Sequence, residues 1–178
     1  MKKIELLAPA GDEEALKAAI MAGANAVYMG GGRFGARAFA GNFEDDKLID
    51  AVDYAHQMGV KIYITANTII KDEEIGDFLN YIDFLYEIGV DAVILQDLGM
   101  IDIISKRIPD LELHASTQMT ASTAQDVLFL KELGVSRVVL SRELSYDEIS
   151  AIKTETNVEV EAFVHGALCV SYSGKCLF

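Results

Sequence analysis

The sequence predicts an α/β protein built as a (β/α)8 TIM-type barrel, and three observations predict it. A short sequence pattern recurs four times, at residues 22–31, 58–67, 88–97 and 133–142. Each copy contains a glycine, then a small or polar position, then an apolar run rich in strand-forming residues. A helical pattern precedes each copy. A polar cluster follows nearly every expected strand, which fits a barrel because all its strands end on one functional face.

Seven strands are expected, each short and apolar through its middle, as strands buried on both faces are. Right-handed crossovers at this spacing also allow an open doubly wound sheet. An open sheet, however, would concentrate polar residues near one switch point. The expected strands are residues 4–8, 26–30, 61–67, 92–96, 111–115, 137–141 and 158–164.

The helices between these strands have recognisable ends. The clearest spans residues 72–89, where apolar residues, Tyr86 among them, recur at helical spacing. Asp12 and Asp72 are expected as N-caps, and residues 145–148 ("SYDE") form a capping box. The glycine of each copy of the repeated pattern is expected to end the preceding helix in the left-handed conformation.

A barrel of this type needs eight strands, and the sequence supplies seven. We therefore expect residues 1–178 to be the N-terminal part of a single barrel domain whose eighth strand and C-terminal region are missing. The longest apolar runs are too short to span a membrane, and the start lacks a secretory signal, so a cytoplasmic protein is expected. The net charge of −13 argues against a broad basic surface for nucleic acid.

A glycine-rich segment follows the second expected strand. Residues 30–35 ("GGGRFG") match G-x-G-x-x-G, but the next helical pattern begins only near Glu44, which makes a dinucleotide site a weak interpretation. Arg33 and Arg37 could instead clamp a carboxylate or a phosphate. A surface loop with solvated arginines explains the segment equally well.

Polar residues also follow the other strands. The fifth is followed by "HASTQ", whose hydrogen-bonding groups could orient a polar substrate, although His114 could equally be a core histidine. Arg142 and Glu143 follow the sixth strand, where a structural ion pair is the alternative to catalysis. From these positions we take the following as candidates: His114, Gln118, Arg142 and Glu143 as catalytic, and Arg33, Arg37, Asn67, Gln96, Ser116 and Thr117 as substrate-binding.

Several enzyme classes lack support in these residues. No lysine lies at the carboxyl end of a strand, which argues against Schiff-base chemistry. The sequence contains no H-E-x-x-H motif, nucleophile elbow or P-loop.

The only two cysteines, Cys169 and Cys176, have six residues between them. This spacing matches neither the common zinc motifs nor a Cys-x-x-Cys redox pair. The segment between them is flexible enough to bring both sulfurs to one metal, but two ligands complete neither a zinc site nor an iron–sulfur site. Two unrelated small hydrophobic residues are the alternative.

Residues 161–176 ("EAFVHGALCVSYSGKC") closely resemble the signature of the peptidase U32 family, the collagenase-like proteases. In that pattern an acid and an aromatic residue precede His-Gly, here at His165, and two cysteines follow. The opening, the "FGARAFAGNF" loop and the "LHASTQM" stretch are also similar to its members. The resemblance covers essentially the whole chain.

The resemblance implies a barrel carrying a four-cysteine [4Fe–4S] cluster, with Cys169 and Cys176 as two ligands, and adds His165 to the catalytic candidates. Members of the family resemble oxygen-independent hydroxylases of ribosomal RNA, transfer RNA or the ubiquinone ring. In the RNA branch, prephenate is implicated as the oxygen source. The "FGARAFAGNF" and "HASTQMT" stretches are most similar to the ribosomal RNA branch.

The resemblance therefore implies a small anionic co-substrate, and RNA bound through a missing C-terminal region. It leaves two alternatives: a peptidase, as the family label states, and a non-catalytic barrel whose thiols bind metal. The 178 residues alone are expected to be inactive.

Overall fold

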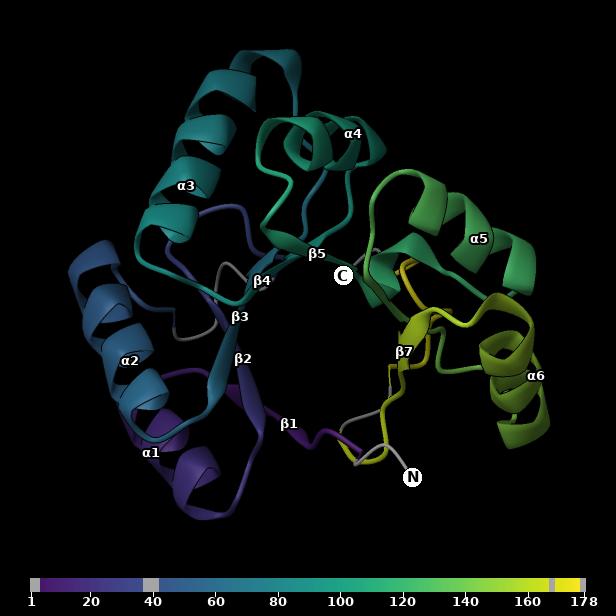
Figure 1. The fold of residues 1–178 in the computed structure, drawn as a ribbon, viewed down its shortest axis with the longest axis horizontal. Coiled ribbons are helices and arrows are strands. Elements are labelled where there is room, and N and C mark those ends of the chain that lie inside the picture. The colour runs from purple at the N-terminus through teal and green to yellow at the C-terminus, as the bar shows by residue number, and fades with distance from the viewer. Residues whose placement is uncertain (1–3, 37–41, 167–168, 177–178) are drawn as a thin grey trace. The chain divides into compact units, whose positions relative to one another are not determined.

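The computed structural model describes residues 4–36, 42–166 and 169–176, in which strands alternate with helices along the chain (Figure 1). The strands are β1 (Leu7–Ala10), β2 (Ala26–Gly30), β3 (Lys61–Ala66), β4 (Ala92–Leu95), β5 (Glu112–Ala115), β6 (Arg137–Val139) and β7 (Glu159–Glu161). The helices are α1 (Glu13–Met21), α2 (Asp45–Gln57), α3 (Ile75–Glu87), α4 (Leu98–Arg107), α5 (Ala124–Glu132) and α6 (Tyr146–Thr156). Two 3-10 turns, η1 (Asp72–Glu74) and η2 (Thr117–Met119), complete the set.

The strands lie in one sheet in the order in which they occur along the chain, β1 to β7. The pairings of β1 with β2, β2 with β3, β5 with β6 and β6 with β7 are parallel. A doubly wound sheet reverses its strand order at a switch point, whereas a barrel adds each strand beside the preceding one. The sequential order confirms the predicted TIM-type fold, and the open-sheet alternative is wrong.

The chain divides into two compact units, residues 1–94 and 95–178. In the first unit, helices α1 to α3 cover one face of the strands (Figure 1). Helices α4 to α6 flank β5 to β7 in the second unit (Figure 1). The small core of the first unit consists of Ala26, Tyr63, Ala92 and Ile94, with Leu7 and Tyr28 packed against them.

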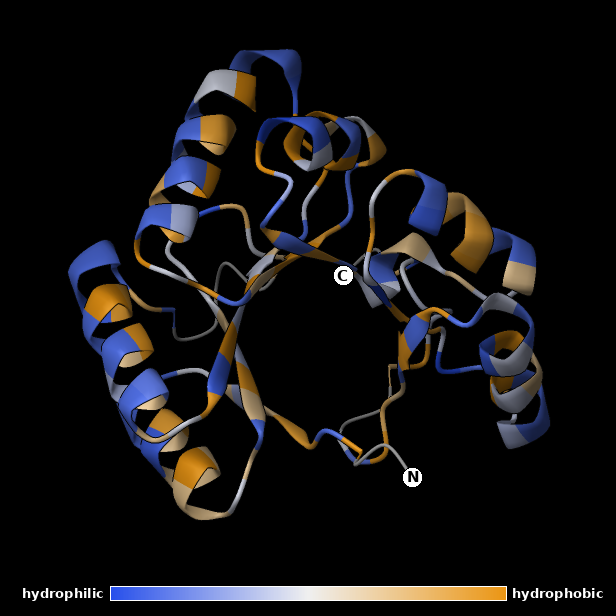
Figure 2. Cartoon of the chain, viewed as in Figure 1, coloured by the Kyte–Doolittle hydropathy of each residue, from blue (hydrophilic) through white to orange (hydrophobic). Residues whose placement is uncertain are grey.

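The helices are amphipathic, and Figure 2 shows hydrophilic and hydrophobic residues together on each of them. In α3 the fully or nearly fully buried side chains are Phe78, Tyr81, Ile82 and Leu85. Their spacing places them on one face of the helix, which is the face that packs on the sheet. No helix in the described part of the chain is long and apolar enough to cross a membrane.

Most of the predicted helix ends are confirmed. The four glycines of the repeated pattern have φ between 72° and 99°, the left-handed region that glycine adopts without a Cβ clash. The Asp12 carboxylate accepts a hydrogen bond from Ala15 N at 2.7 Å, and Ser145 and Glu148 form the predicted capping box.

The predicted N-cap at Asp72 is wrong. Residues Asp72–Glu74 form a 3-10 turn ahead of α3, and Glu74 supplies the carboxylate that accepts from Lys71 N at 2.9 Å. Three acids in succession offer three possible capping side chains. The local sequence therefore does not specify which of them closes the turn.

The buried face of α3 also differs from prediction. Tyr86 is 45% exposed, whereas Tyr81 is fully buried. The Tyr81 ring lies 5.9 Å from the Phe34 ring, which comes from the loop after β2. Helical periodicity does not contain this tertiary contact, which explains why Tyr81 rather than Tyr86 lies on the buried face.

The two outermost strands depart most from prediction. The first strand is Leu7–Ala10 rather than residues 4–8, because Leu6 N donates to the Asn25 side chain at 2.9 Å. The last strand is Glu159–Glu161 rather than residues 158–164. In the sheet order each of these strands has a neighbour on one side only, so fewer backbone hydrogen bonds fix its ends.

Candidate functional site

The polar segments that follow β5, β6 and β7 form one hydrogen-bonded cluster in the second unit. Its centre is residues 169–176, which we name the cysteine loop. The loop lies against residues 116–120 after β5 and residues 141–143 after β6. Because parallel strands end on the same side of a sheet, these three segments meet at one edge.

Cys169 and Cys176 lie at the two ends of the cysteine loop, exposed and not joined by a disulfide. Ser171 N donates to Cys169 Sγ at 3.4 Å, and a hydrogen bond joins the two thiols. These two hydrogen bonds, with a smaller contribution from the positive charge of Arg142, lower the pKa of the Cys169 thiol below its usual range. The segment thus folds back and brings the two sulfurs close together, while their role as metal ligands stays a prediction.

Ser173 is the one described residue of the loop that is buried, at 2% exposure. Its Oγ accepts from Arg142 N at 3.1 Å and from Arg142 Nε at 3.3 Å. Glu143 Oε1 accepts from Ser173 N at 3.0 Å and from Ser173 Oγ at 3.3 Å. Arg142 Nη2 also donates to Ser171 O at 3.1 Å, so the segment after β6 holds the loop at two residues.

A second contact fixes the loop from the segment after β5. Thr120 Oγ1 donates to Ser173 O at 2.8 Å. Thr120 has φ of 57°, a conformation that costs a β-branched residue about 1–3 kcal/mol. At Gly174, with φ of 72°, a Cβ would overlap Gln118 O and lie 2.7 Å from Thr120 Oγ1. Only glycine fits this close approach of backbones.

The charged groups of Arg142 and Glu143 are therefore directed at the cysteine loop. Burial raises the pKa of Glu143, but the Ser173 N–H and Oγ–H and the nearby Arg142 outweigh it, so the pKa is lowered overall. A carboxylate that accepts two hydrogen bonds from the loop acts as an anchor here. The catalytic role predicted for both residues stays a prediction.

The segment after β5 is ordered by its own hydrogen bonds. Ser116 N donates to Leu95 O at 2.7 Å, and Ser116 Oγ accepts from Gln118 N at 3.2 Å. Thr117 Oγ1 is buried and has no hydrogen-bond partner among the described residues. Gln118 is half-buried beside the cysteine loop. Three of the predicted substrate-orienting residues thus lie together beside the cysteine loop.

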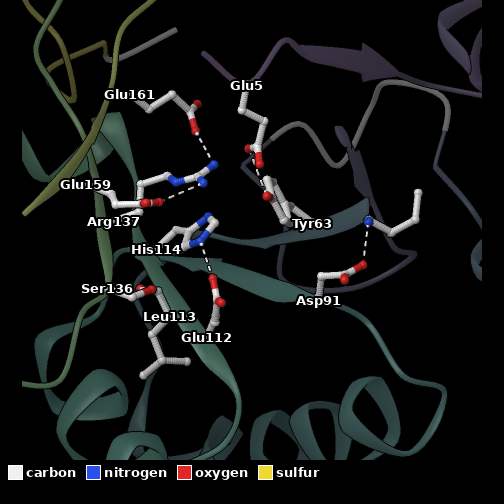
Figure 3. A network of polar contacts seen from close by, with 11 residues as sticks. Glu5, Tyr63, Asp91, Glu112, Leu113, His114, Ser136, Arg137, Glu159 and Glu161 are labelled. Carbon is white, nitrogen blue, oxygen red and sulfur yellow. Dashed lines mark hydrogen bonds and ion pairs between the residues drawn. The ribbon is translucent and has the colours of Figure 1, made fainter. Parts of the chain in front are cut away.

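His114 lies apart from that group, inside β5 and fully buried. Its Nε2 is 3.5 Å from Glu112 Oε2, and the β-sheet register places His114 beside Arg137 (Figure 3). Arg137 in turn pairs with Glu159 at 3.0 Å and lies 3.9 Å from Glu161. This arrangement is that of a core histidine in an ion network, the alternative that the sequence left open.

In the first unit, the loop after β2 contains Arg33. Its Nη2 donates to Asp45 Oδ2 at 2.7 Å, and its guanidinium lies 4.8 Å from the centre of the Tyr81 ring. Asn67 Oδ1 accepts from Ala36 N at 3.0 Å and so holds the same loop. Both predicted substrate-binding residues thus have structural contacts.

The remaining predicted residues have fewer assigned contacts. Arg37 lies outside the described residues. Gln96 is half-buried directly after β4, in the second unit. His165 is exposed between β7 and the cysteine loop. The structure therefore brings together Ser116, Thr117, Gln118, Arg142, Glu143, Cys169 and Cys176, and does not add Gln96 or His165 to that cluster.

The donor set of the cysteine loop fits part of an iron–sulfur site. Two thiols converge at one place, and one of them has a lowered pKa, which favours the thiolate that binds iron. Across the described ranges, no three His, Cys, Asp or Glu side chains are arranged to hold a metal ion. The loop thus offers two ligands, and a four-cysteine cluster takes two more.

Sequence reasoning missed Ser173 and Thr120, which help to fix the loop. The Ser-Gly pair at 173–174 is a turn signal and marks the bend. Nothing in the sequence indicates that a threonine more than 50 residues earlier bonds this turn, because the contact exists only once β5 and β7 lie near each other.

Known proteins are similar to the chain along nearly all of its length. The family model described as peptidase family U32 matches residues 11–178. The chain is 46% identical over 174 residues to the Escherichia coli 23S rRNA 5-hydroxycytidine C2501 synthase, covering 98% of the chain and 26% of that protein. It is 41% identical over 176 residues to tRNA hydroxylation protein P1 of Bacillus subtilis, covering 99% of the chain and 42% of that protein. The chain thus spans about a quarter to two-fifths of the length of these relatives.

Solved structures share the fold at low sequence identity. A U32 peptidase structure matches with a TM-score of 0.75 and 16% identity, over 90% of this chain and 68% of that one. Phosphonopyruvate hydrolase in complex with oxalate and magnesium matches with a TM-score of 0.60 and 14% identity, over 90% of this chain and 66% of that one. Since the family match covers nearly every residue, the chain belongs to peptidase family U32.

Proposed function

We propose that this chain supplies two of the four cysteine ligands of an iron–sulfur cluster in an enzyme that hydroxylates RNA without molecular oxygen. The observation that carries the proposal is the convergence of Cys169 and Cys176 at the two ends of one anchored loop. A thiol whose pKa is lowered binds iron more readily, because the thiolate is the ligand.

The class of substrate comes from the named activities of the relatives. The relative at 46% identity is named for 5-hydroxycytidine formation in 23S rRNA, and those at 41% and 38% identity are named for tRNA hydroxylation. We propose ribosomal RNA as the substrate. With a net charge of −13, the chain repels a phosphate backbone, so we infer that the main RNA contacts lie in another part of the protein.

The proposed oxygen donor is prephenate, a small dicarboxylate. Arginine side chains bind carboxylates in bidentate pairs, and Arg33 is a candidate. Its guanidinium is already paired with Asp45 and stacked over Tyr81. A donor that binds Arg33 must therefore displace the Asp45 carboxylate. Ser116, Thr117 and Gln118, next to the cysteine loop, offer neutral hydrogen-bonding groups instead.

The residues of this chain prepare the site in three ways. The Ser171 N–H and the Arg142 charge stabilise negative charge on Cys169. Arg142, Glu143 and Thr120 hold the cysteine loop in place. Both thiols face solvent, which leaves room for further ligands and a substrate. A bound cluster would supply one-electron chemistry at this edge of the barrel.

The test is iron and sulfide analysis of the full-length protein purified without oxygen, with Cys169→Ser and Cys176→Ser as variants. We expect about four iron atoms per wild-type chain and loss of most iron from either variant. RNA mass spectrometry of cells that carry only a variant gene should show loss of hydroxycytidine.

A matched control is Val170→Ser, which adds the same hydroxyl group to the same loop at a side chain that is 97% exposed. Its iron content and RNA modification should equal those of the wild type. A wild-type protein that is colourless and contains no iron contradicts the proposal.

A further inference from the structure

The cysteine loop is anchored almost entirely through Ser173, which is not one of the two cysteines proposed as cluster ligands. All three polar atoms of Ser173 are engaged: N and Oγ donate to Glu143, Oγ accepts from Arg142, and O accepts from Thr120. The donor–acceptor distances lie between 2.8 and 3.3 Å. These partners come from two different strand ends, so the loop is held from two directions.

The neighbours of Ser173 are not held in this way. Val170 and Tyr172 are 97% and 67% exposed, and both cysteines are exposed. A loop of this kind would sample many conformations without an anchor, because exposed side chains contribute little packing. Ser173 is midway between the two thiols in the sequence, three or four residues from each.

We propose that Ser173 is the positioning residue of the cluster site, and that Arg142, Glu143 and Thr120 act through it to hold both thiols together before iron arrives. This inference rests on the proposed function and assigns Arg142 and Glu143 a role different from direct catalysis. Such preorganisation favours metal binding, since the ligands need less ordering when the cluster forms.

The test compares Ser173→Ala with Ser150→Ala in the full-length protein. Ser150 lies on the exposed surface of α6 and is the matched control. In the apo protein, we expect backbone amides of residues 170–176 to exchange hydrogen about tenfold faster in Ser173→Ala, because hydrogen bonds to charged groups are lost. The number of iron atoms per chain should fall by about half or more in Ser173→Ala, because the same lost hydrogen bonds no longer hold the two thiols in place. Ser150→Ala should change neither measurement.

A second pair of variants keeps the test sharp if Ser173→Ala folds poorly. Glu143→Gln retains an oxygen that accepts from Ser173 N, whereas Glu143→Ala removes it. We expect Glu143→Gln to keep slow exchange, most of its iron and a wild-type electron paramagnetic resonance signal after reduction. Glu143→Ala should show fast exchange and a broadened or weakened signal.

The outcomes separate the two proposals. If the wild type binds iron, and Ser173→Ala and Glu143→Ala match it in exchange and in iron content, the positioning role is overturned and the proposed function stands. If the wild type holds no iron, the proposed function fails, and faster exchange in Ser173→Ala would show only that Ser173 orders the loop. Rescue in Glu143→Gln but not in Glu143→Ala supports the positioning role.

Discussion

The Tyr81 hydroxyl shows how a single buried atom constrains the chain around it. It is buried and has no hydrogen-bond partner among the described residues. Burial, and to a lesser degree the nearby Asp45 carboxylate, raise the pKa of Tyr81 above its usual range, so the group stays protonated as a donor without an acceptor. The same oxygen occupies the position that a Cβ at Gly31 would need. The glycine is thus required by a contact rather than by its φ.

We predict that Tyr81→Phe raises the free energy of unfolding by about 1 kcal/mol, since an unsatisfied buried hydroxyl is removed. Gly31→Ala should lower it by about 2–3 kcal/mol through overpacking. In the double variant the nearest ring atom, Cζ, lies 3.1 Å from the new Cβ, so much of the loss should be recovered. Urea denaturation measures all three values.

Gly76→Ala is the control for that cycle, because Gly76 is exposed on the same helix as Tyr81 and a Cβ there meets nothing within 4 Å. It should stabilise by about 0.5–1 kcal/mol, as glycine-to-alanine changes in helices do. If Gly31→Ala lowers the free energy of unfolding equally in the wild type and in Tyr81→Phe, the Tyr81 hydroxyl is not the group that the new Cβ overlaps.

Individual functional residues were predictable only where chemistry marks the residue type. Cys169 and Cys176 are the only thiols in the chain, so their pairing could be expected, and the structure brings them together. Arg142 and Glu143 were identified by position, but their contacts with Ser173 were not foreseeable. A serine carries no distinguishing chemistry in a sequence, and its partners lie about 30 and 50 residues away.

At the scale of elements, α5 shows how a short helix is fixed at its start. Thr123 Oγ1 accepts from Asp126 N at 3.1 Å, and Asp126 Oδ2 accepts from Ser122 N and Thr123 N at 2.9 and 2.8 Å. Burial raises the pKa of Asp126, but the hydrogen bonds that its carboxylate accepts from Ser122 N, the Thr123 side chain and Thr123 N outweigh it and lower the pKa overall.

A carboxyl group whose pKa is lowered on folding stabilises the folded state fully at pH values above its pKa in the unfolded chain. This stabilisation is lost as the pH falls through its pKa in the folded chain. We predict that Asp126→Asn lowers the free energy of unfolding by about 1 kcal/mol at pH 7. The difference from wild type should shrink below about pH 4, where Asp126 protonates in the unfolded chain. Thermal melts at pH 7, 5 and 3 measure it.

Glu132→Gln, in the last turn of the same helix, is the matched control for Asp126→Asn. It removes one negative charge where an acid is unfavourable to the helix dipole, so stability should stay equal or rise slightly. A constant difference between wild type and Asp126→Asn from pH 7 to pH 3 would contradict the assigned cause.

The elements themselves were largely predictable, because local rules set them. Repeated glycines with positive φ end the helices as expected, and each of the seven strands overlaps one of the expected ranges. The errors fall where tertiary contacts decide. The first strand begins at Leu7 because the Asn25 side chain binds Leu6 N, and Tyr81 rather than Tyr86 is buried in α3 because its ring packs beside Phe34. No window of local sequence contains either contact.

At the scale of the whole chain, two properties oppose each other. The outermost strands β1 and β7 each have one neighbour, and large apolar side chains beside them are exposed, among them Ile4, Leu6, Phe163 and Val164. Exposed strand edges promote association. Against this, Pro9 interrupts the hydrogen-bonding edge of β1, and β7 is three residues long with two glutamates.

Charge decides between these tendencies, because the chain carries 28 acidic and 15 basic residues. Repulsion between copies acts over about 30 Å at 10 mM salt and about 8 Å at 150 mM salt. We predict that residues 1–178 produced alone are monomeric at low salt and self-associate as the salt concentration rises, since screening removes the repulsion and leaves the apolar edges. Light scattering and sedimentation velocity across this range measure the change.

Val164→Lys beside β7 should suppress the self-association. Ile103→Lys on α4, at a side chain that is 38% exposed, is the control and should leave the self-association unchanged. A monomer at every salt concentration that melts cooperatively would show that Pro9 and the short acidic β7 already protect the edges.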